Sequence, residues 1–444
     1  MTLANSMSGL IAAAKAIDVV GNNIANSQTI GFKSSIARFA SVTPVGSAGG
    51  PSGKSGSAGV SADNIFQQFT QGNVEQSNSP LDIAINGLGF FRLYDPETNR
   101  ITYTRDGQFR LSYEGDSFPK LVTRSGLNLT GNLPDFSTDP YGTIDTTPAP
   151  VPIAVDPYFP PKPSSAVQLN LNLDSRVAAP AIAFDPANPL SYNISTMATV
   201  FDGAGEAHDL RMYLAKPAAA SVWSAYTTLD FDANASPPMV PVVSGPLALN
   251  FDTQGVLTTT MPMPPITLPT ANGNLQVSLD FGGTTQLGTS FSMNAVTQDG
   301  YGEGKIQEAS EFAVLADGHI SARYSNGQRR NVAQVVLANF TNANALINLG
   351  DNQWTTNDDP VRGTGTVSLG FPNFSTPKGS AAVGNSDTSE GFGSLQGFAV
   401  EQSNVDLSVE LVSLIEQQRN YQASAQTFKI LDQVLQNLAN MRSV

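Results

Sequence analysis

The segment NVDLSVELVSLIEQQRNYQASAQTFKILDQVLQNLAN, residues 404–440, decides the fold class of the C-terminal end. Large side chains recur in it at alternating steps of three and four residues, which is the heptad spacing of a coiled-coil helix. Residues 403–406 supply helix caps, and Glu410 adds a negative charge to the first turns. We therefore predict a helix of about 50 Å that runs from about residue 405 to about residue 441. Its seam positions are Leu407, Leu411, Leu414, Gln418, Tyr421, Ala425, Phe428 and, after a change of phase, Leu431, Leu435 and Leu438.

The N-terminal end carries the same kind of pattern. Helix-stop signals follow it at residues 26–31. One amphipathic helix would fit an ordinary helical bundle, but two at opposite ends, with no third helix between them, must close on each other or on other copies of the chain. The N-terminal seam positions are Leu3, Met7, Leu10, Ala14, Ile17, Gly21 and Ile24.

Between the ends, the sequence changes to short alternating segments typical of β-strands. One block covers residues 81–131, in which Asp106-Gly107 is a hairpin signal. A second block covers residues 311–340, with turn signals at Asp317-Gly318 and Asn326-Gly327. We expect both blocks to belong to one discontinuous β domain.

Two Gly/Ser-rich tracts, residues 44–61 and 374–397, are typical of flexible linkers and lie just inside the two helices. This symmetry predicts discontinuous nested domains. Within residues 146–295, strands and turns recur roughly every 8–12 residues, which is typical of a β sandwich or barrel. We therefore predict a mainly β chain with helical termini. Its four parts are the terminal coiled-coil helices (1–30 and 400–444), connectors (31–70 and 366–399), a discontinuous β domain (71–145 and 296–365) and an inserted outer β domain (146–295).

Composition excludes several classes of protein. The 444 residues carry a formal net charge of −14, and only 14% of them are charged. A nucleic-acid-binding protein needs a basic stripe, whereas this chain has isolated pairs such as Arg329-Arg330. The absence of cysteine excludes disulfides and Cys-ligated zinc. We find neither an apolar run of about 18 residues nor a cleavable signal, so we expect no membrane or nucleic-acid partner.

Three patterns that could carry chemistry are weak. Residues 49–55 approach a phosphate-binding loop but lack its first glycine, which favours a linker. Residues 230–241 begin like a calcium loop and end in proline where a glutamate is required. The two histidines, His208 and His319, could serve a zinc site or a catalytic triad, but each lies beside a turn and is more simply a surface or hairpin residue. The sequence therefore predicts no enzyme, no cofactor and no metal site.

The most specific motifs lie at the two ends. Asn22-Asn23-Ile24-Ala25-Asn26, followed by Thr29 and Gly31-Phe32-Lys33, resembles the signature N-N-I-A-N-x-x-T-x-G-F-K of flagellar rod and hook axial proteins. Residues 403–407, 418–422 and 432–433 resemble the C-terminal signature of the same family. Ser424 departs from it, because the family usually has asparagine there.

The interior separates the members of this family. Residues 81–85, 103–107 and 350–354 resemble the β domain of hook proteins, whereas rod subunits are shorter and lack a large insert. The resemblance implies a structural subunit of the flagellar hook, a flexible hollow helical tube that transmits torque from rod to filament. A distal rod or hook–filament junction subunit is the first alternative. A secreted enzyme or adhesin on a β scaffold is the second.

The resemblance also implies partners and an extracellular location in the flagellum. The partners are other copies of the chain, the rod, the hook cap, the hook–filament junction proteins and the flagellar type III export apparatus, which uses no cleavable signal. The residues expected to carry assembly are Leu3, Met7, Leu10, Ile17, Asn22, Asn23, Ile24, Asn26, Gly31, Phe32, Asn404, Asp406, Leu407, Leu411, Leu414, Gln418, Arg419, Tyr421, Gln422, Leu431, Leu435 and Leu438.

Overall fold

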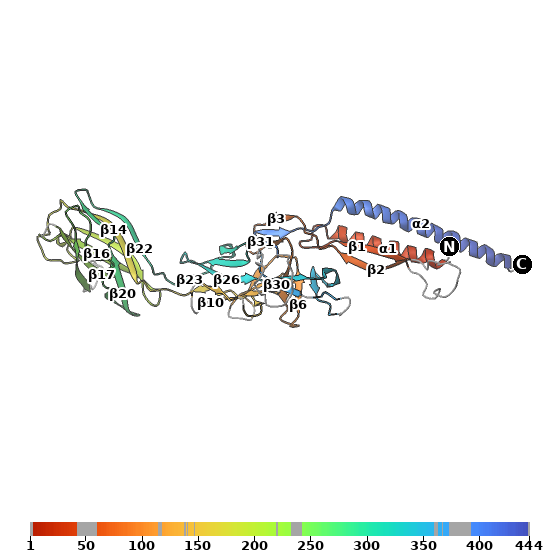
Figure 1. The fold of residues 1–444 in the computed structure, drawn as a ribbon, viewed down its shortest axis with the longest axis horizontal. Helices are drawn as coiled ribbons and strands as arrows, with labels where there is room; N and C mark the ends of the chain where they lie inside the picture. The colour runs from red at the N-terminus through yellow and green to blue at the C-terminus, as the bar shows by residue number, and fades with distance from the viewer. Residues whose placement is uncertain are drawn as a thin grey trace. The chain divides into compact units, whose positions relative to one another are not determined.

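The structure of the chain is a computed structural model, and it forms two compact units that we describe separately (Figure 1). The first unit comprises Met1–Asp156, Glu308–Arg323 and Arg329–Val444, and the inserted unit comprises Pro157–Gln307 and Tyr324–Gln328. The four predicted domain boundaries stay a prediction. The structure describes residues 3–41, 60–113, 118–136, 139, 141–145, 147–218, 221–231, 242–358, 363–365, 367–372 and 392–442.

The first unit contains both terminal helices. α1 (Leu3–Ala25) and α2 (Leu407–Arg442) lie side by side, and a ribbon of β1 (Ser35–Ser41) and β2 (Val60–Gln67) also packs on α1 (Figure 1). The helices run in opposite directions, since Asn23 contacts Glu410 while Gly9 lies near Ser424. At 1.5 Å per residue, the 36 residues of α2 span about 54 Å.

The stripe that α1 buries within the chain differs from the seam of large residues that its sequence suggests. The buried positions lie three and four residues apart and are mostly small, which lets the helix approach its neighbours closely. Met7 is exposed, and Leu10, Ile17 and Ile24 are only half-buried. The buried stripe consists of Ser6, Ala12, Ala13, Ala16, Val19, Val20 and Asn23.

A large antiparallel sheet forms the centre of the first unit. Its aromatic core joins residues from both predicted β blocks, with Phe90, Tyr103, Phe340 and Trp354 in edge-to-face contact. The strands along its main path are β24 (Phe312–Val314), β25 (His319–Arg323), β26 (Arg329–Val335), β9 (Asn128–Asn132), β5 (Phe90–Tyr94), β6 (Ile101–Thr104), β29 (Gln353–Thr355) and β28 (Ile347–Gly350). Beside it lie β7 (Arg110–Ser112), β8 (Lys120–Val122), β12 (Val151–Pro152), β27 (Leu337–Phe340) and β30 (Val367–Gly370).

The structure corrects one predicted turn. Asp106-Gly107 follows β6, but β6 pairs with β5 and β29, and β7 pairs with β8. The segment instead passes close to the start of β4 (Ile83–Asn86), where the amide of Ile83 donates to Gly107 O at 2.9 Å. A Cβ at Gly107 would lie 1.7 Å from Ile83 O, so this close approach requires glycine. The Asp317-Gly318 turn is confirmed, because β24 and β25 pair across it.

Three short ribbons complete the first unit. β3 (Val74–Gln76) pairs with β32 (Ala399–Glu401), and β4 pairs with β31 (Ser394–Gly397), so the chain ahead of α2 is bound by two strands from the N-terminal part. β10 (Pro134–Asp135) pairs with β11 (Thr143–Ile144). The pairs β3–β32 and β4–β31 hold the start of α2 close to the end of the predicted N-terminal motif.

The inserted unit is a β sandwich whose two sheets enclose a large apolar core around Trp223. One sheet contains β14 (Ala166–Asp174), β19 (Ile266–Thr270), β20 (Gly273–Asp280), β21 (Thr285–Leu287) and β22 (Ser292–Gln298), and β14 pairs in parallel with β20 and β21. The other contains β15 (Ile194–Phe201), β16 (Ala207–Ala215), β17 (Val222–Leu229) and β18 (Val243–Asn250). β13 (Tyr158–Phe159) pairs with β23 (Gly304–Lys305).

The predicted fold class, mainly β with helical termini, is confirmed. Short 3-10 helices occur at Pro189–Ser191, Ala309–Glu311 and Ala343–Ala345. Among the described residues, no helix combines the length and apolarity that a membrane span requires. Residues 49–55 and 232–241, most of the two weak ligand-loop patterns, lie outside the described residues, as do most of the two Gly/Ser-rich tracts.

Candidate functional site

Asn23 connects the N-terminal helix to both of its neighbours. Its amide nitrogen donates to Ser35 O at 2.8 Å and to Glu410 Oε1 at 2.9 Å, and its oxygen accepts the Ser35 amide at 2.9 Å. The Asn23 side chain is buried, and these bonds satisfy both its amide nitrogen and its oxygen. One asparagine of the N-terminal motif therefore binds the edge of β1 and the first turns of α2 together.

The residues after Asn23 turn the chain sharply. The Asn26 amide nitrogen donates to Asn22 O at 2.9 Å at the end of α1, and Thr29 Oγ1 donates to Asn26 Oδ1 at 3.2 Å. Gly31 follows with a φ of 70°, and a Cβ there would lie 2.6 Å from Asp106 N. Glycine is required at this position by both the left-handed backbone and the close approach.

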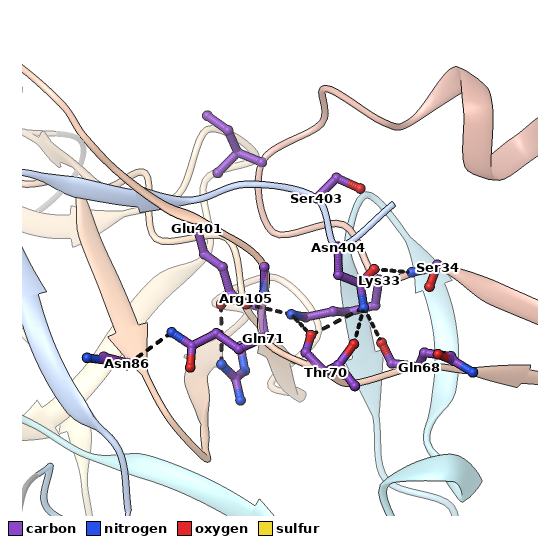
Figure 2. Close-up of polar contacts among 12 residues, drawn as sticks. Lys33, Ser34, Gln68, Thr70, Gln71, Asn86, Arg105, Glu401, Ser403 and Asn404 are labelled. Carbon is purple, nitrogen blue, oxygen red and sulfur yellow. Dashed lines mark hydrogen bonds and ion pairs between the residues drawn. The ribbon is translucent and has the colours of Figure 1, made fainter. Parts of the chain in front are cut away.

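Lys33, Arg105 and Glu401 form a buried ion triad (Figure 2). Lys33 Nζ lies 2.6 Å from Glu401 Oε1, and Arg105 Nη1 lies 3.2 Å from Glu401 Oε2. The Lys33 and Glu401 side chains are 0% exposed and that of Arg105 is 2% exposed. The triad joins the segment after α1, the turn after β6 and the end of β32.

Backbone groups add further hydrogen bonds to the triad, although Arg105 Nε is buried without a hydrogen-bond partner among the described residues. Lys33 Nζ also donates to Thr70 O at 2.7 Å, Arg105 Nη2 donates to Gly87 O at 3.0 Å, and the Gly72 amide donates to Glu401 Oε1 at 2.8 Å. Burial lowers the pKa of Lys33 and of Arg105 from their usual ranges, and the Glu401 carboxylate opposes both shifts. A single carboxylate therefore offsets part of the desolvation of two cations.

Asn404 and Asp406 fix the start of α2. The Asn404 side chain accepts the Ser34 amide at 2.7 Å and donates to Gln68 O at 2.7 Å and to Thr70 Oγ1 at 2.9 Å (Figure 2). Asp406 caps the helix, because its Oδ1 accepts the amides of the second and third residues after it, at 2.9 and 3.2 Å. The first turn of α2 is thus set by side chains from the C-terminal motif.

No described side chain of α2 is buried within the chain. Leu414 and Leu431 are half-buried, whereas Leu411 is 45% exposed and Val412 is 67% exposed. The other large apolar side chains exposed along the helix are Leu407, Val409, Ile415, Tyr421, Ile430 and Val434. The apolar surface of α2 is therefore much larger than the part of it that α1 covers.

The structure divides the predicted assembly residues into three groups by their exposure. Buried are Asn23 and Gly31; half-buried are Leu10, Ile17, Ile24, Asn26, Phe32, Asn404, Leu414 and Leu431. Exposed are Met7, Asn22, Asp406, Leu407, Leu411, Gln418, Arg419, Tyr421 and Gln422. The side chains of Leu3, Leu435 and Leu438 lie outside what the structure describes.

Sequence reasoning did not select the charges of the triad as site residues. Lys33 ends the N-terminal motif, Arg105 stands in YTRDG, and Glu401 stands in FAVEQSN. In a chain with 14% charged residues, a lone charge within a strand-like apolar run is a signal of a buried partner. The sequence contains this signal, but it does not say which charges meet.

Comparison with known proteins agrees with these features. Family models match residues 3–33 (Flagella basal body rod protein), 84–172 (Flagellar hook protein FlgE/F/G D1 domain), 172–301 (Flagellar basal body protein FlaE D2 domain) and 396–441 (Flagellar basal body rod FlgEFG protein C-terminal). The chain is 36% identical to the Flagellar hook protein FlgE of Escherichia coli strain K12 over 447 residues, covering all of both chains. The chain belongs to the flagellar hook protein family.

Other members of the hook protein family match over the same length. The Flagellar hook protein FlgE of Salmonella typhimurium is 36% identical over 446 residues, and that of Borreliella burgdorferi is 26% identical over 477 residues. The first alignment covers all of both chains, and the second covers 100% of this chain and 99% of the relative. These relatives are all named hook proteins, which favours the hook over the rod or junction alternative.

Proposed function

We propose that this chain is the structural subunit of the flagellar hook and that it polymerises through α1 and α2 into a hollow helical tube. The observation that carries the proposal is the apolar surface of α2. Burying the exposed parts of Leu407, Val409, Leu411, Val412 and Ile415 contributes roughly 1 kcal/mol each, before the cost of ordering the partners. Other copies of the same helix pair provide a matching apolar surface.

The predicted assembly residues take separate parts in this proposal. The direction in which α1 and α2 extend from the region of the ion triad is set by Asn23, Gly31, Asn404 and Asp406. The apolar residues exposed on α2 contact other copies. Head-to-tail contacts that do not close into a ring generate a helical polymer. Exposed glutamines such as Gln418 provide a polar, weakly charged inner wall.

The wider role of the polymer rests on membership of the hook protein family. We propose that the tube is flexible and transmits torque from rod to filament, outside the cell, and that its end partners are the rod, the hook cap and the junction proteins. We also propose that the chain is exported through the flagellar type III apparatus. A curved polymer supports the hook role, whereas a straight one supports a rod subunit.

The test replaces Val412 by asparagine in the full chain. Val412 is 67% exposed, so the stability of the monomer should change by no more than about 0.5 kcal/mol. Polymerisation, measured by sedimentation and electron microscopy, should be lost or need a much higher protein concentration. The control is Leu190→Asn, which alters a similarly exposed apolar side chain, 77% exposed, in the inserted unit. If Val412→Asn polymerises like the parent chain, the helix surface is not the assembly contact.

A further inference from the structure

The turn between β15 and β16 holds a carboxylate in a fixed orientation. Asp202 Oδ1 accepts the amides of Ala204 and Glu206, at 3.0 and 2.9 Å, and the turn is closed by Gly205 with a φ of 84°. The side chain is 2% exposed. Because Oδ1 is occupied by the amides of the turn, the other carboxylate oxygen, Oδ2, is left for contacts outside these amides.

His208, two residues beyond Glu206, is also held in a fixed orientation. Its Nδ1 is hydrogen-bonded to Asp230 Oδ2, and Asp230 Oδ1 accepts the Asp209 amide at 2.7 Å. The residue is 8% exposed, so of the two predicted settings, surface or hairpin, the structure shows a buried histidine beside a hairpin. In the neutral tautomer in which Nδ1 donates to the Asp230 carboxylate, Nε2 carries a free lone pair, which is the arrangement of a metal-binding histidine.

Nε2 of His208 is directed at the fixed carboxylate. It is buried and has no hydrogen-bond partner among the described residues, although Asp202 Oδ2 lies 3.4 Å away. Two ligands that each lie about 2.1 Å from a tetrahedral metal are ~3.4 Å apart, so this separation already fits. A ligand oxygen of Glu206 lies within 4.8 Å of both atoms, and this exposed side chain can move closer.

The side-chain amide of Asn272 lies where a bound cation would interact with both carboxylates. Its amide nitrogen lies between the two carboxylates, 2.8 Å from Asp202 Oδ2 and 3.3 Å from Glu206 Oε2. The amide partly neutralises two acids that would otherwise repel each other. A cation at the same place would do so more strongly, and rotation of the amide would turn its oxygen toward the metal.

We propose that Asp202, Glu206 and His208 bind a transition-metal dication of the Zn²⁺ class, with Asp230 orienting the histidine. One imidazole and two carboxylates suit Zn²⁺, and the buried nitrogen ligand disfavours Ca²⁺ and Mg²⁺, which prefer oxygen. Three protein ligands leave the fourth position to water. The bound metal would link Asp202, which follows β15, to His208, which lies in β16.

The test is calorimetric titration of ZnCl₂ into the tag-free full chain after removal of metals with EDTA. We expect saturable binding of one Zn²⁺ per chain and much weaker binding of Ca²⁺ and Mg²⁺. His208→Gln should abolish binding, and Asp230→Asn should weaken it about 10–100-fold. His319→Gln is the matched control, because His319 also lies beside an aspartate, with Nδ1 3.0 Å from Asp317 Oδ2, yet lacks the other ligands. Its affinity should equal that of the parent chain.

A second variant guards against a folding defect. Glu206→Gln changes an exposed side chain, so the chain should keep its fold, checked by the fluorescence of buried Trp223, and lose at least about tenfold in affinity. Zn²⁺ should also shift the imidazole NMR signals of His208 and leave those of His319 unchanged. Absence of Zn²⁺ binding, equal affinity for Ca²⁺, or unchanged affinity in Glu206→Gln would each overturn the proposal.

Discussion

Replacing Glu401 by glutamine tests how much the ion triad contributes to the first unit. The change keeps the volume of the side chain and removes the one carboxylate that faces Lys33 and Arg105, both almost fully buried. Removal of one partner from a buried ion pair costs about 3–5 kcal/mol, because it leaves the remaining charge uncompensated. We expect a loss of about 3 kcal/mol or more, and with a urea slope near 2 kcal/mol/M the midpoint should fall by about 1.5 M.

The two tryptophans allow each unit to be followed separately. Trp354 lies in the core of the first unit and Trp223 in the core of the inserted unit. In a Trp223→Phe background, urea unfolding of Glu401→Gln should show the reduced midpoint. In a Trp354→Phe background, the same substitution should leave the midpoint unchanged. Glu75→Gln is the control, since Glu75 is exposed on β3 and accepts side-chain hydrogen bonds only from the neutral amides of Asn73 and Gln402 among the described residues. If Glu401→Gln, like Glu75→Gln, lowers the free energy of unfolding by less than about 1 kcal/mol, the ion triad does not stabilise the first unit.

Three further predictions follow from single contacts. Gly31→Ala should destabilise the first unit by about 1–3 kcal/mol, because the φ of Gly31 is 70° and the new Cβ would meet the backbone of Asp106. Gly21→Ala in α1 should instead stabilise the first unit by about 0.5–1 kcal/mol, because its Cβ meets nothing within 4 Å. Thermal unfolding measures both effects. Brief trypsin treatment of the monomer, read by mass spectrometry, should cut at exposed Arg419 well before buried Lys33. Burial would raise the pKa of Asp299, but hydrogen bonds from the Ser165 side chain and nearby amides, helped by Lys162, hold it at about 2, so its stabilisation is present above about pH 4 and is lost as the pH falls toward 2.

Each of these predictions has an outcome that contradicts it. Equal effects of alanine at Gly31 and Gly21 would show that the tight approach after α1 relaxes freely. Cleavage at Lys33 before Arg419 would show that the triad opens more readily than α2. For Asp299, the stability advantage of the parent chain over Asp299→Asn, at most about 2 kcal/mol after allowance for solvent screening, should shrink between pH 5 and pH 2, and a constant advantage would refute the assigned shift.

The helical ends were predictable because their signals are local. Heptad spacing and the caps at residues 403–406 require no knowledge of distant neighbours, and α2 begins at Leu407 and ends at Arg442, near the predicted limits. The same reasoning selected large residues as the contact face of α1. The chain buries Ala16 and Val20 instead, in a helix that packs against both α2 and the β1–β2 ribbon. Periodicity shows that a face exists, but the neighbours determine which face is buried.

The site was less predictable because it is built from distant residues. Lys33 and Glu401 are separated by 368 positions, and Arg105 lies 296 positions from Glu401. The Asp106-Gly107 pair was read as a hairpin turn because only its own residues were considered. In the structure, Gly107 instead accepts a backbone hydrogen bond from Ile83, a residue of β4. His208 was read as a surface or hairpin residue, and its burial was not foreseen, because Asp230 reaches it from beyond β17 while Asp202 reaches it across the β15–β16 turn.

The order in which the chain becomes available limits when the triad can form. Lys33 and Arg105 are made early, but their shared carboxylate belongs to the last tenth of the sequence. A ribosome-bound chain that lacks residue 401 therefore carries two cations that cannot yet be desolvated at low cost. Until residue 401 arrives, β3 and β4 also lack their partners β32 and β31. The region around the ion triad, from which α1 and α2 extend, can therefore close only after residue 401 has been made.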